Sequence, residues 1–140
     1  VPEIVRIVPP QQTGSPMADD ELTIGLRQRE VKSGRVCECA CGTGSLTVHL
    51  RRAGYQITGV DLSQEMLSVA MEKARNAGLT IPFVRQDMCK LSLHRRQDAV
   101  LCTCDGLNYL TTPARARAFF RAAYHALKPG GALPDGAIRQ

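Results

Sequence analysis

The stretches RVCECACGTGS (residues 35–45) and TGVDLS (residues 58–63) give the strongest indication of the fold. The apolar run before the glycines is typical of a short buried strand over 35–41, and Gly42-Thr43-Gly44 is typical of a tight turn into a helix. The free backbone N–H groups at the start of such a helix favour an anionic group. Asp61 ends the next strand, where a carboxylate can accept both hydroxyls of a ribose. Together these stretches indicate a nucleoside-binding turn.

Outward from this turn, strand and helix patterns alternate, which predicts βαβ units and a parallel sheet. Predicted strands cover 35–41, 55–60, 81–86 and 99–104, and predicted helices cover 45–53, 64–77 and 113–127. The run Lys128-Pro129-Gly130-Gly131 ends the last helix. The proline and glycine within 132–136 then leave only a weak fifth strand.

The composition divides the chain near residue 35. Residues 1–20 are rich in proline and lack a sustained period, so we expect a disordered arm there. Residues 21–34 predict a short helix and a linker, with Asp19 and Asp20 as candidate caps. Residues 35–140 are expected to form the α/β domain.

The overall composition bounds the class of protein. A chain of 140 residues with 44% hydrophobic and 22% charged side chains suits one globular domain and excludes two enzymatic domains. No segment reaches the apolar length of a membrane helix, and the N-terminal segment lacks the pattern of a signal peptide. We therefore expect a cytoplasmic protein without a membrane partner.

The net charge of +5 lies in residues 37–140, because residues 1–36 hold equal numbers of acidic and basic side chains. With three Tyr, three Phe and no Trp, few aromatic side chains are available to stack on bases. A solvated basic helix face explains the spaced arginines as well as a nucleic-acid-binding surface does, so a nucleic-acid partner is not favoured. Those arginines are Arg115, Arg117 and Arg121.

The glycine turn also separates two classes of nucleotide ligand. A dinucleotide fingerprint needs a small third residue, but this chain has Thr47 at that position. Glu38, near the end of the first strand, repels a pyrophosphate and favours a cationic amine or sulfonium. A dinucleotide such as NAD is therefore disfavoured.

Five ordered segments between Val36 and Gly131 resemble the class I S-adenosylmethionine-dependent methyltransferases, particularly the small-molecule type, whose first motif reads like L-D-L-A-C-G-T-G. The matching segments are 38–44, 59–63, 86–88, 98–105 and 127–131. The resemblance implies a three-layer Rossmann-like α/β fold with strand order 3-2-1-4 and the weak fifth strand. It also implies methyl transfer from S-adenosylmethionine to a small molecule. Relative to the seven-stranded family sheet, the predicted sheet is incomplete and the chain resembles a truncated member.

Carried over position by position, the resemblance assigns cofactor contacts around the glycine turn. Ala40, Gly42 and Gly44 would line the methionine part, Glu38 would lie near its amine, and Asp61 would hold the ribose hydroxyls.

Further contacts follow the second, third and fourth strands. Asp87 would accept a hydrogen bond from the adenine N6 amine, although it could instead cap the next turn. The resemblance adds contacts at Leu62, Met66, Met88 and Cys104, although a methionine such as Met66 is more often a core residue than part of a cofactor wall.

No catalytic residue follows from the sequence. Methyl transfer from a sulfonium is an in-line displacement that needs alignment and exclusion of water, and a base only for some acceptors. Candidate bases are Asp105 and Tyr109, with His49, His94 and His125 as further possibilities. Asp105 could also simply begin an Asp-Gly turn. The segment 105–109 lacks the N-P-P-[YF] motif of nucleic-acid methyltransferases, which favours a small-molecule acceptor.

The chain has six cysteines, and five of them are spaced two residues apart, at positions 37, 39 and 41 and at 102 and 104; the sixth is Cys89. Their spacing is not that of a zinc knuckle, and disulfides between i and i+2 on a strand have poor geometry. In the order 3-2-1-4 the first and fourth strands are neighbours, so we expect a buried thiol-rich patch between them and no metal. A metal or redox cluster is the alternative.

The incomplete sheet leaves strand four or a frayed strand five as an apolar edge. We expect pairing there with a second copy or a partner chain. The alternative function is a catalytically inactive cofactor-binding fragment or scaffold without the acceptor half.

Overall fold

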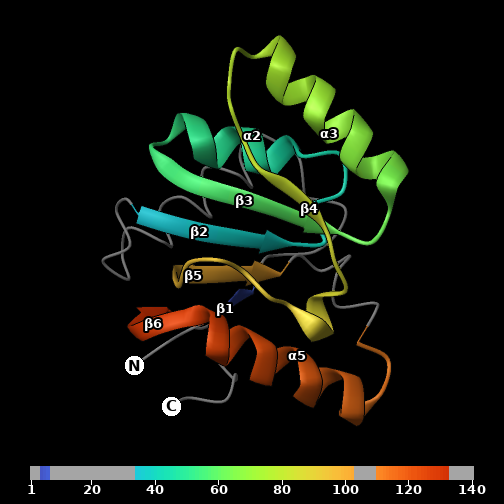
Figure 1. The fold of residues 1–140 in the computed structure, drawn as a ribbon, viewed down its shortest axis with the longest axis vertical. Coiled ribbons are helices and arrows are strands. Elements are labelled where there is room, and N and C mark those ends of the chain that lie inside the picture. Colours follow the sequence, from blue (N-terminus) through green and yellow to red (C-terminus); the bar gives the residue numbers. More distant parts are fainter. Residues whose placement is uncertain (1–3, 7–33, 103–109, 133–140) are drawn as a thin grey trace.

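A computed structural model describes residues 4–6, 34–102 and 110–132 of the chain. Its strands and helices alternate along most of the sequence (Figure 1). In chain order they are β1 (Ile4–Arg6), β2 (Gly34–Cys39), α2 (Ser45–Arg52), β3 (Tyr55–Asp61), α3 (Gln64–Asn76), β4 (Phe83–Arg85), the 3₁₀ turn η2 (Met88–Lys90), β5 (Gln97–Cys102), α5 (Pro113–Ala126) and β6 (Leu127–Ala132).

The helices begin where local chemistry provides a cap. The Ser63 hydroxyl accepts a hydrogen bond from the Met66 backbone N–H at 3.2 Å, which starts α3. The Thr112 hydroxyl accepts from the Arg115 N–H at 3.1 Å, and Pro113 occupies the first turn of α5, where its missing N–H costs nothing. The starts of α3 at Gln64 and of α5 at Pro113 confirm the predicted starts of these two helices.

The sheet is parallel, and its central order is β4-β3-β2-β5. Val36 of β2 pairs with Ile57 of β3 on one side and with Ala99 of β5 on the other. In the numbering of the predicted strands this is the order 3-2-1-4, so the predicted topology is confirmed.

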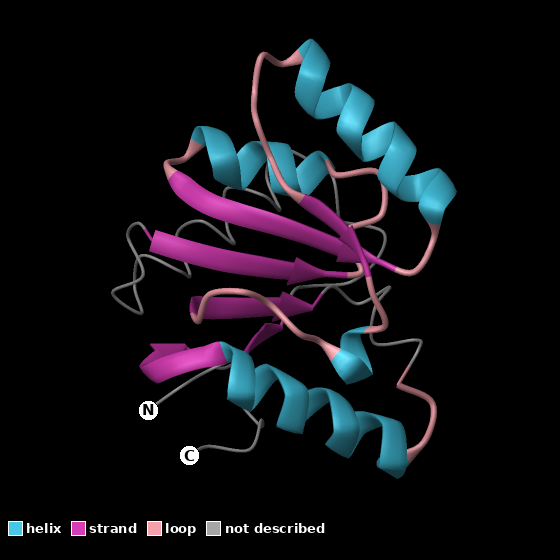
Figure 2. Cartoon of the chain, viewed as in Figure 1, coloured by secondary structure: helices cyan, strands magenta, loops and turns pink. Residues whose placement is uncertain are grey.

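Helices cover both faces of the sheet and make the fold three-layered (Figure 2). Val36 packs in one buried cluster with Leu46 and Leu50 of α2. The next residue, Cys37, belongs to the opposite cluster with Phe119 of α5. Because successive strand residues point to opposite faces, α2 and α5 lie on different sides of the sheet.

The last strand differs from the prediction. The helix ends at Ala126, and β6 begins at Leu127, so the expected turn is already part of a strand. Leu127 pairs with Gln97 and Ala132 with Ala99, with an irregular register between them. Among the described strands β6 pairs only with β5. Pro129, which has no N–H, is therefore tolerated on this outer strand.

The side of β5 opposite β2 is shared by two strands. β6 pairs near the start of β5, and β1 pairs with its last residues, where Ile4 faces Val100 and Arg6 faces Cys102. β5 is thus not an open edge in the described chain. β1 falls within the range expected to be an arm. The rest of that arm, and the helix expected from Glu21 to about Val31, lie outside the described residues.

The cysteines form the expected buried patch between β2 and β5. Cys37, Cys39 and Cys102 are all at most 1% exposed, and Cys39 lies beside Cys102 in the strand register. The Cys102 thiol lies 3.8 Å from the Met88 sulfur. A hydrogen bond with Cys37 and burial raise the pKa of the Cys39 thiol, so it stays protonated at neutral pH. Cys104 lies outside the described residues.

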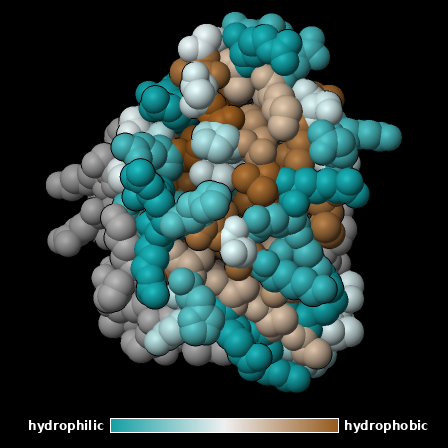
Figure 3. Space-filling view, in the orientation of Figure 1, coloured by the Kyte–Doolittle hydropathy of each residue, from teal (hydrophilic) through white to brown (hydrophobic). Residues whose placement is uncertain are grey.

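One face of the molecule carries a concentration of apolar side chains (Figure 3). Figure 3 shows apolar residues down the middle of the face seen in Figure 1, bordered by hydrophilic side chains. The exposed large apolar side chains lie mostly on or just before α3 and are Leu62, Met66, Val69, Met71 and Tyr124. In the described parts of the chain, no helix is long and apolar enough to cross a membrane.

Candidate functional site

The loop between β2 and α2 adopts left-handed backbone conformations at three positions. Ala40, Gly42 and Gly44 have φ values of 56°, 55° and 79°. For Ala40 this conformation costs about 1–2 kcal/mol, which marks the loop as constrained. A Cβ on Gly44 would lie 2.8 Å from the Cβ of Ala70 in α3, so only glycine lets α2 start this close to α3. A Cβ on Gly42 would meet nothing within 4 Å and would project into open space.

Asp61 ties this loop to the end of β3. One carboxylate oxygen, Oδ2, accepts a hydrogen bond from the Gly42 N–H at 2.8 Å, and the other, Oδ1, accepts from the Ser63 N–H at 2.9 Å. The Cys41 N–H also donates to the Val60 carbonyl at 3.0 Å. The carboxylate is therefore held rigidly at the carboxyl edge of the sheet, with room for each oxygen to accept one further donor.

Glu38 lies beneath the loop rather than at the surface. It is 1% exposed, and its Oε1 accepts a hydrogen bond of 2.6 Å from the hydroxyl of Thr47, which is also fully buried. Thr47, the residue that is too large for a dinucleotide fingerprint, thus donates a hydrogen bond to Glu38, the acidic residue of the first motif. A buried carboxylate needs such a donor because an unpaired buried charge is costly.

Asp87 follows β4 and performs the capping role that the sequence left open. Its Oδ1 accepts from the Cys89 N–H at 2.9 Å and thereby caps η2. The Arg115 guanidinium lies 3.4 Å from the same oxygen. The Cys89 N–H and, against partial burial, the nearby Arg115 lower the pKa of the Asp87 carboxyl. Asp87 is therefore ionised at neutral pH.

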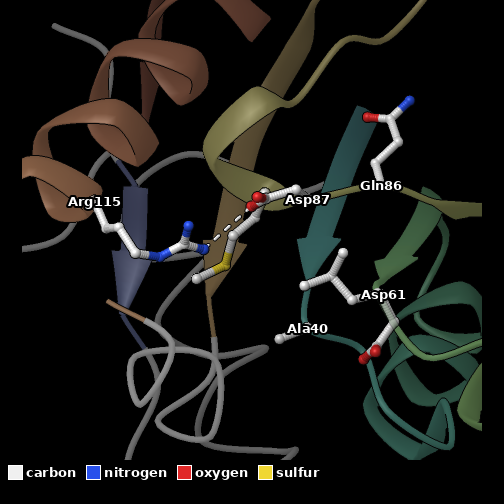
Figure 4. A pocket seen from close by; sticks show the side chains of 7 residues that line it. Ala40, Asp61, Gln86, Asp87 and Arg115 are labelled. Carbon is white, nitrogen blue, oxygen red and sulfur yellow. Dashed lines mark hydrogen bonds and ion pairs between the residues drawn. The ribbon is translucent and has the colours of Figure 1, made fainter. Parts of the chain in front are cut away.

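These groups surround a hollow of about 290 Å³, part of it open to solvent. The hollow lies where β2, β3 and β4 end, which is where ligands bind in open α/β sheets. Figure 4 shows Asp61 and Asp87 at separate positions around it, with Arg115 reaching toward Asp87 from α5. The lining residues are Ala40, Asp61, Leu62, Gln86, Asp87, Met88 and Arg115.

The structure brings most of the described candidates to this hollow. Ala40, Asp61, Leu62, Asp87 and Met88 line it, and Gly42 and Gly44 belong to the adjoining loop. Glu38 and Met66 do not line it, because Glu38 is buried against Thr47 and Met66 is 44% exposed on α3. The remaining candidates, Cys104, Asp105 and Tyr109, lie outside the described residues.

The three histidines are spread over the molecule. His49 lies in α2 and His125 in α5, as predicted, and His94 is exposed in the segment before β5. None of them lines the hollow. In the described chain, no three His, Cys, Asp or Glu side chains gather in a way that could hold a metal ion.

Two residues that line the hollow, Gln86 and Arg115, were not predicted from the sequence. Gln86 directly precedes Asp87, so its position in the third motif was an available signal. No sequence signal placed Arg115 in the site, because spaced arginines on a helix are typical of a solvated face. Only the packing of α5 beside η2 brings Arg115 to Asp87.

A parallel sheet in this order, with a left-handed glycine loop after β2, a carboxylate at the end of β3 and another after β4, is a Rossmann-like α/β arrangement. A family model described as "Methyltransferase domain" matches residues 36–131. The chain therefore belongs to the methyltransferase domain family.

Individual relatives agree with this assignment. The chain is 38% identical over 115 residues to YqeM of Bacillus subtilis (strain 168), provisionally named as a methyltransferase, and the match covers 81% of this chain and 46% of YqeM. A structure of an S-adenosylmethionine-dependent methyltransferase from Clostridium acetobutylicum ATCC 824 has a TM-score of 0.76 at 34% identity, over 81% of this chain and 46% of that one.

A third relative was solved with a ligand. Magnesium protoporphyrin IX methyltransferase from Synechocystis PCC 6803, with bound SAH, has a TM-score of 0.70 at 26% identity, over 84% of this chain and 53% of that one. The chain thus spans about half the length of these relatives.

Proposed function

We propose that this chain forms the cofactor-binding half of an S-adenosylmethionine-dependent methyltransferase that acts on a small molecule. The observation that carries the proposal is the Asp61 carboxylate, fixed by the Gly42 and Ser63 N–H groups at the rim of a hollow that also contains Asp87. Membership of the methyltransferase domain family and the SAH-bound relative support it.

The residues at the hollow fit the three parts of this cofactor. Gly42 leaves open space beside the loop backbone, where the methionine part would pass. Asp61 would hold the ribose hydroxyls, since each of its oxygens has accepted only one backbone N–H. Met88 and Leu62 would contact the adenine ring, and Asp87 would accept from its N6 amine.

When bound, S-adenosylmethionine supplies a methyl group on a positively charged sulfur, which is the source of the reactivity. The contribution of the chain is to hold and orient the cofactor. Its anchors lie on strand ends and on a loop locked by backbone hydrogen bonds, so little ordering is needed on binding. The buried Glu38 lies beneath the loop, where an ionised acidic side chain would favour a cationic ligand over a pyrophosphate.

A small-molecule acceptor is supported by the sequence after β5 and by one relative. The segment 105–109 lacks the nucleic-acid motif, and the Synechocystis relative is named for a porphyrin acceptor. Assays of methyl transfer from labelled S-adenosylmethionine to small amines and hydroxyl compounds, with RNA in parallel, test this. Labelling of RNA alone would contradict the proposed acceptor class. Cofactor binding without any transfer would favour the non-catalytic alternative.

Isothermal titration with S-adenosylmethionine tests cofactor binding first. We expect Asp61→Asn to weaken binding by about tenfold or more, because hydrogen bonds to a charged group contribute roughly 1.5–3 kcal/mol. Glu65→Gln, an exposed change in the first turn of α3, is the matched control and should bind normally. No binding by the unaltered chain at millimolar cofactor, or equal loss in both variants, would refute the proposal.

A further inference from the structure

Arg115 is attached to η2 at two points besides its own helix cap. Its guanidinium Nη2 lies 3.4 Å from the Asp87 Oδ1, and its backbone carbonyl accepts a hydrogen bond of 3.4 Å from the Cys89 thiol. Its backbone N–H donates to the Thr112 hydroxyl that begins α5. The first turn of α5 and η2 therefore form one connected unit at the rim of the hollow.

The contacts to Asp87 are unevenly divided between its two oxygens. Oδ1 accepts from the Cys89 N–H at 2.9 Å and lies within 3.4 Å of Arg115. Oδ2 is the oxygen that neither of these two donors contacts. Because both donors hold one oxygen, the plane of the carboxylate is fixed and Oδ2 is the oxygen left for a ligand that enters the hollow.

We propose that Arg115 is a positioning residue that orients Asp87 and thereby makes the site selective for a 6-amino purine over a 6-oxo purine. This inference rests on the proposed function, in which Asp87 accepts from the adenine amine. The selectivity arises because an adenine N6 amine donates a hydrogen bond to the Asp87 Oδ2. The 6-oxo group of hypoxanthine is itself an acceptor, so two acceptors would face each other without a proton between them.

The geometry also explains why the cation is an arginine on a helix. The Arg115 side chain is 39% exposed and that of Asp87 is 25% exposed, so their attraction alone is weak. The contribution of Arg115 is directional, because the Thr112 and Cys89 contacts fix its backbone and its planar guanidinium presents donors in a rigid arrangement. A lysine at this position keeps the charge but loses that rigid arrangement of donors.

The test compares two ligands that differ at one position of the base. Affinities of the 140-residue chain for S-adenosylhomocysteine and S-inosylhomocysteine are measured by isothermal titration for the unaltered chain, Arg115→Ala and Arg115→Lys. Arg117→Ala is the matched control, because Arg117 is an exposed arginine of the same helix that does not line the hollow. Thermal unfolding of each variant verifies that it is folded.

We expect the unaltered chain to prefer the adenosyl ligand and Arg115→Ala to reduce that preference by about tenfold, mainly through weaker adenosyl binding. Arg115→Lys should retain part of the preference, and Arg117→Ala all of it. A merely structural role would lower both affinities equally and leave their ratio unchanged.

An unchanged ratio in Arg115→Ala, with Asp61→Asn still defective, would overturn this inference and leave the proposed function intact. Failure of the unaltered chain to bind either ligand would instead overturn the proposed function, and this inference with it. If Arg115→Ala does not fold, Arg115→Lys decides the matter, because an unchanged ratio there would contradict the need for a guanidinium.

Discussion

Replacing Gly44 by alanine tests how closely the cofactor loop is packed against α3. The left-handed φ of 79° costs an alanine about 1–2 kcal/mol. The new methyl group would also lie 2.8 Å from the Ala70 Cβ and 3.3 Å from its Cα, and such overpacking costs about 1–3 kcal/mol more. We therefore expect Gly44→Ala to lower the free energy of unfolding by about 2–5 kcal/mol, a large share of a typical total.

Gly78→Ala is the matched control, because Gly78 has a similar φ of 71° but nothing within 4 Å of its Cβ position. Urea unfolding followed by circular dichroism should show a loss of only about 1–2 kcal/mol for this control. Adding Ala70→Gly to Gly44→Ala should recover part of the steric cost. Equal losses for Gly44→Ala and Gly78→Ala would refute the argument, since they would mean that α2 and α3 are not held in close contact at this point.

The remaining predictions concern the cofactor loop and its surroundings. Gly42→Ala should weaken S-adenosylmethionine binding more than it lowers stability, because its methyl group projects into open space beside the loop; calorimetry and urea unfolding measure the two effects. Thr47→Val should destabilise the chain by about 1–3 kcal/mol in urea, since it removes the 2.6 Å hydrogen bond to the buried Glu38. Asp87 has a lowered pKa, so its stabilising effect is complete above the unfolded pKa and is lost as the pH falls through the folded value; Asp87→Asn should therefore flatten the acid side of the stability–pH profile. Burial raises the pKa of the Cys41 thiol, so mass spectrometry should show slow alkylation of Cys41 at neutral pH, and fast alkylation would contradict its buried position.

The helix boundaries that are set by residues close together in the sequence could be predicted. The predicted starts of α3 at residue 64 and of α5 at residue 113, and the end of α3 near residue 77, rest on local backbone chemistry and agree with the structure. The order of the strands was predicted from the resemblance of five ordered segments to the methyltransferase family, and the structure agrees with it. The buried cysteines followed from period-two spacing together with that order.

Features that depend on contacts between distant residues were not predictable. β6 starts at Leu127 because the chain pairs with Gln97 on a strand thirty residues earlier, and no local signal shows this pairing. Arg115 meets Asp87 only because α5 packs beside η2. The link between Thr47 and Glu38 was likewise hidden, since the sequence showed Thr47 only as a residue too large for a dinucleotide site.

A crystal structure of the chain with S-adenosylhomocysteine would show whether the hollow at the ends of β2, β3 and β4 holds this ligand. We expect both ribose hydroxyls within hydrogen-bond distance of the Asp61 carboxylate, and the adenine amine beside the Asp87 Oδ2. A ligand bound elsewhere, or bound in the hollow with its ribose away from Asp61, would contradict this expectation.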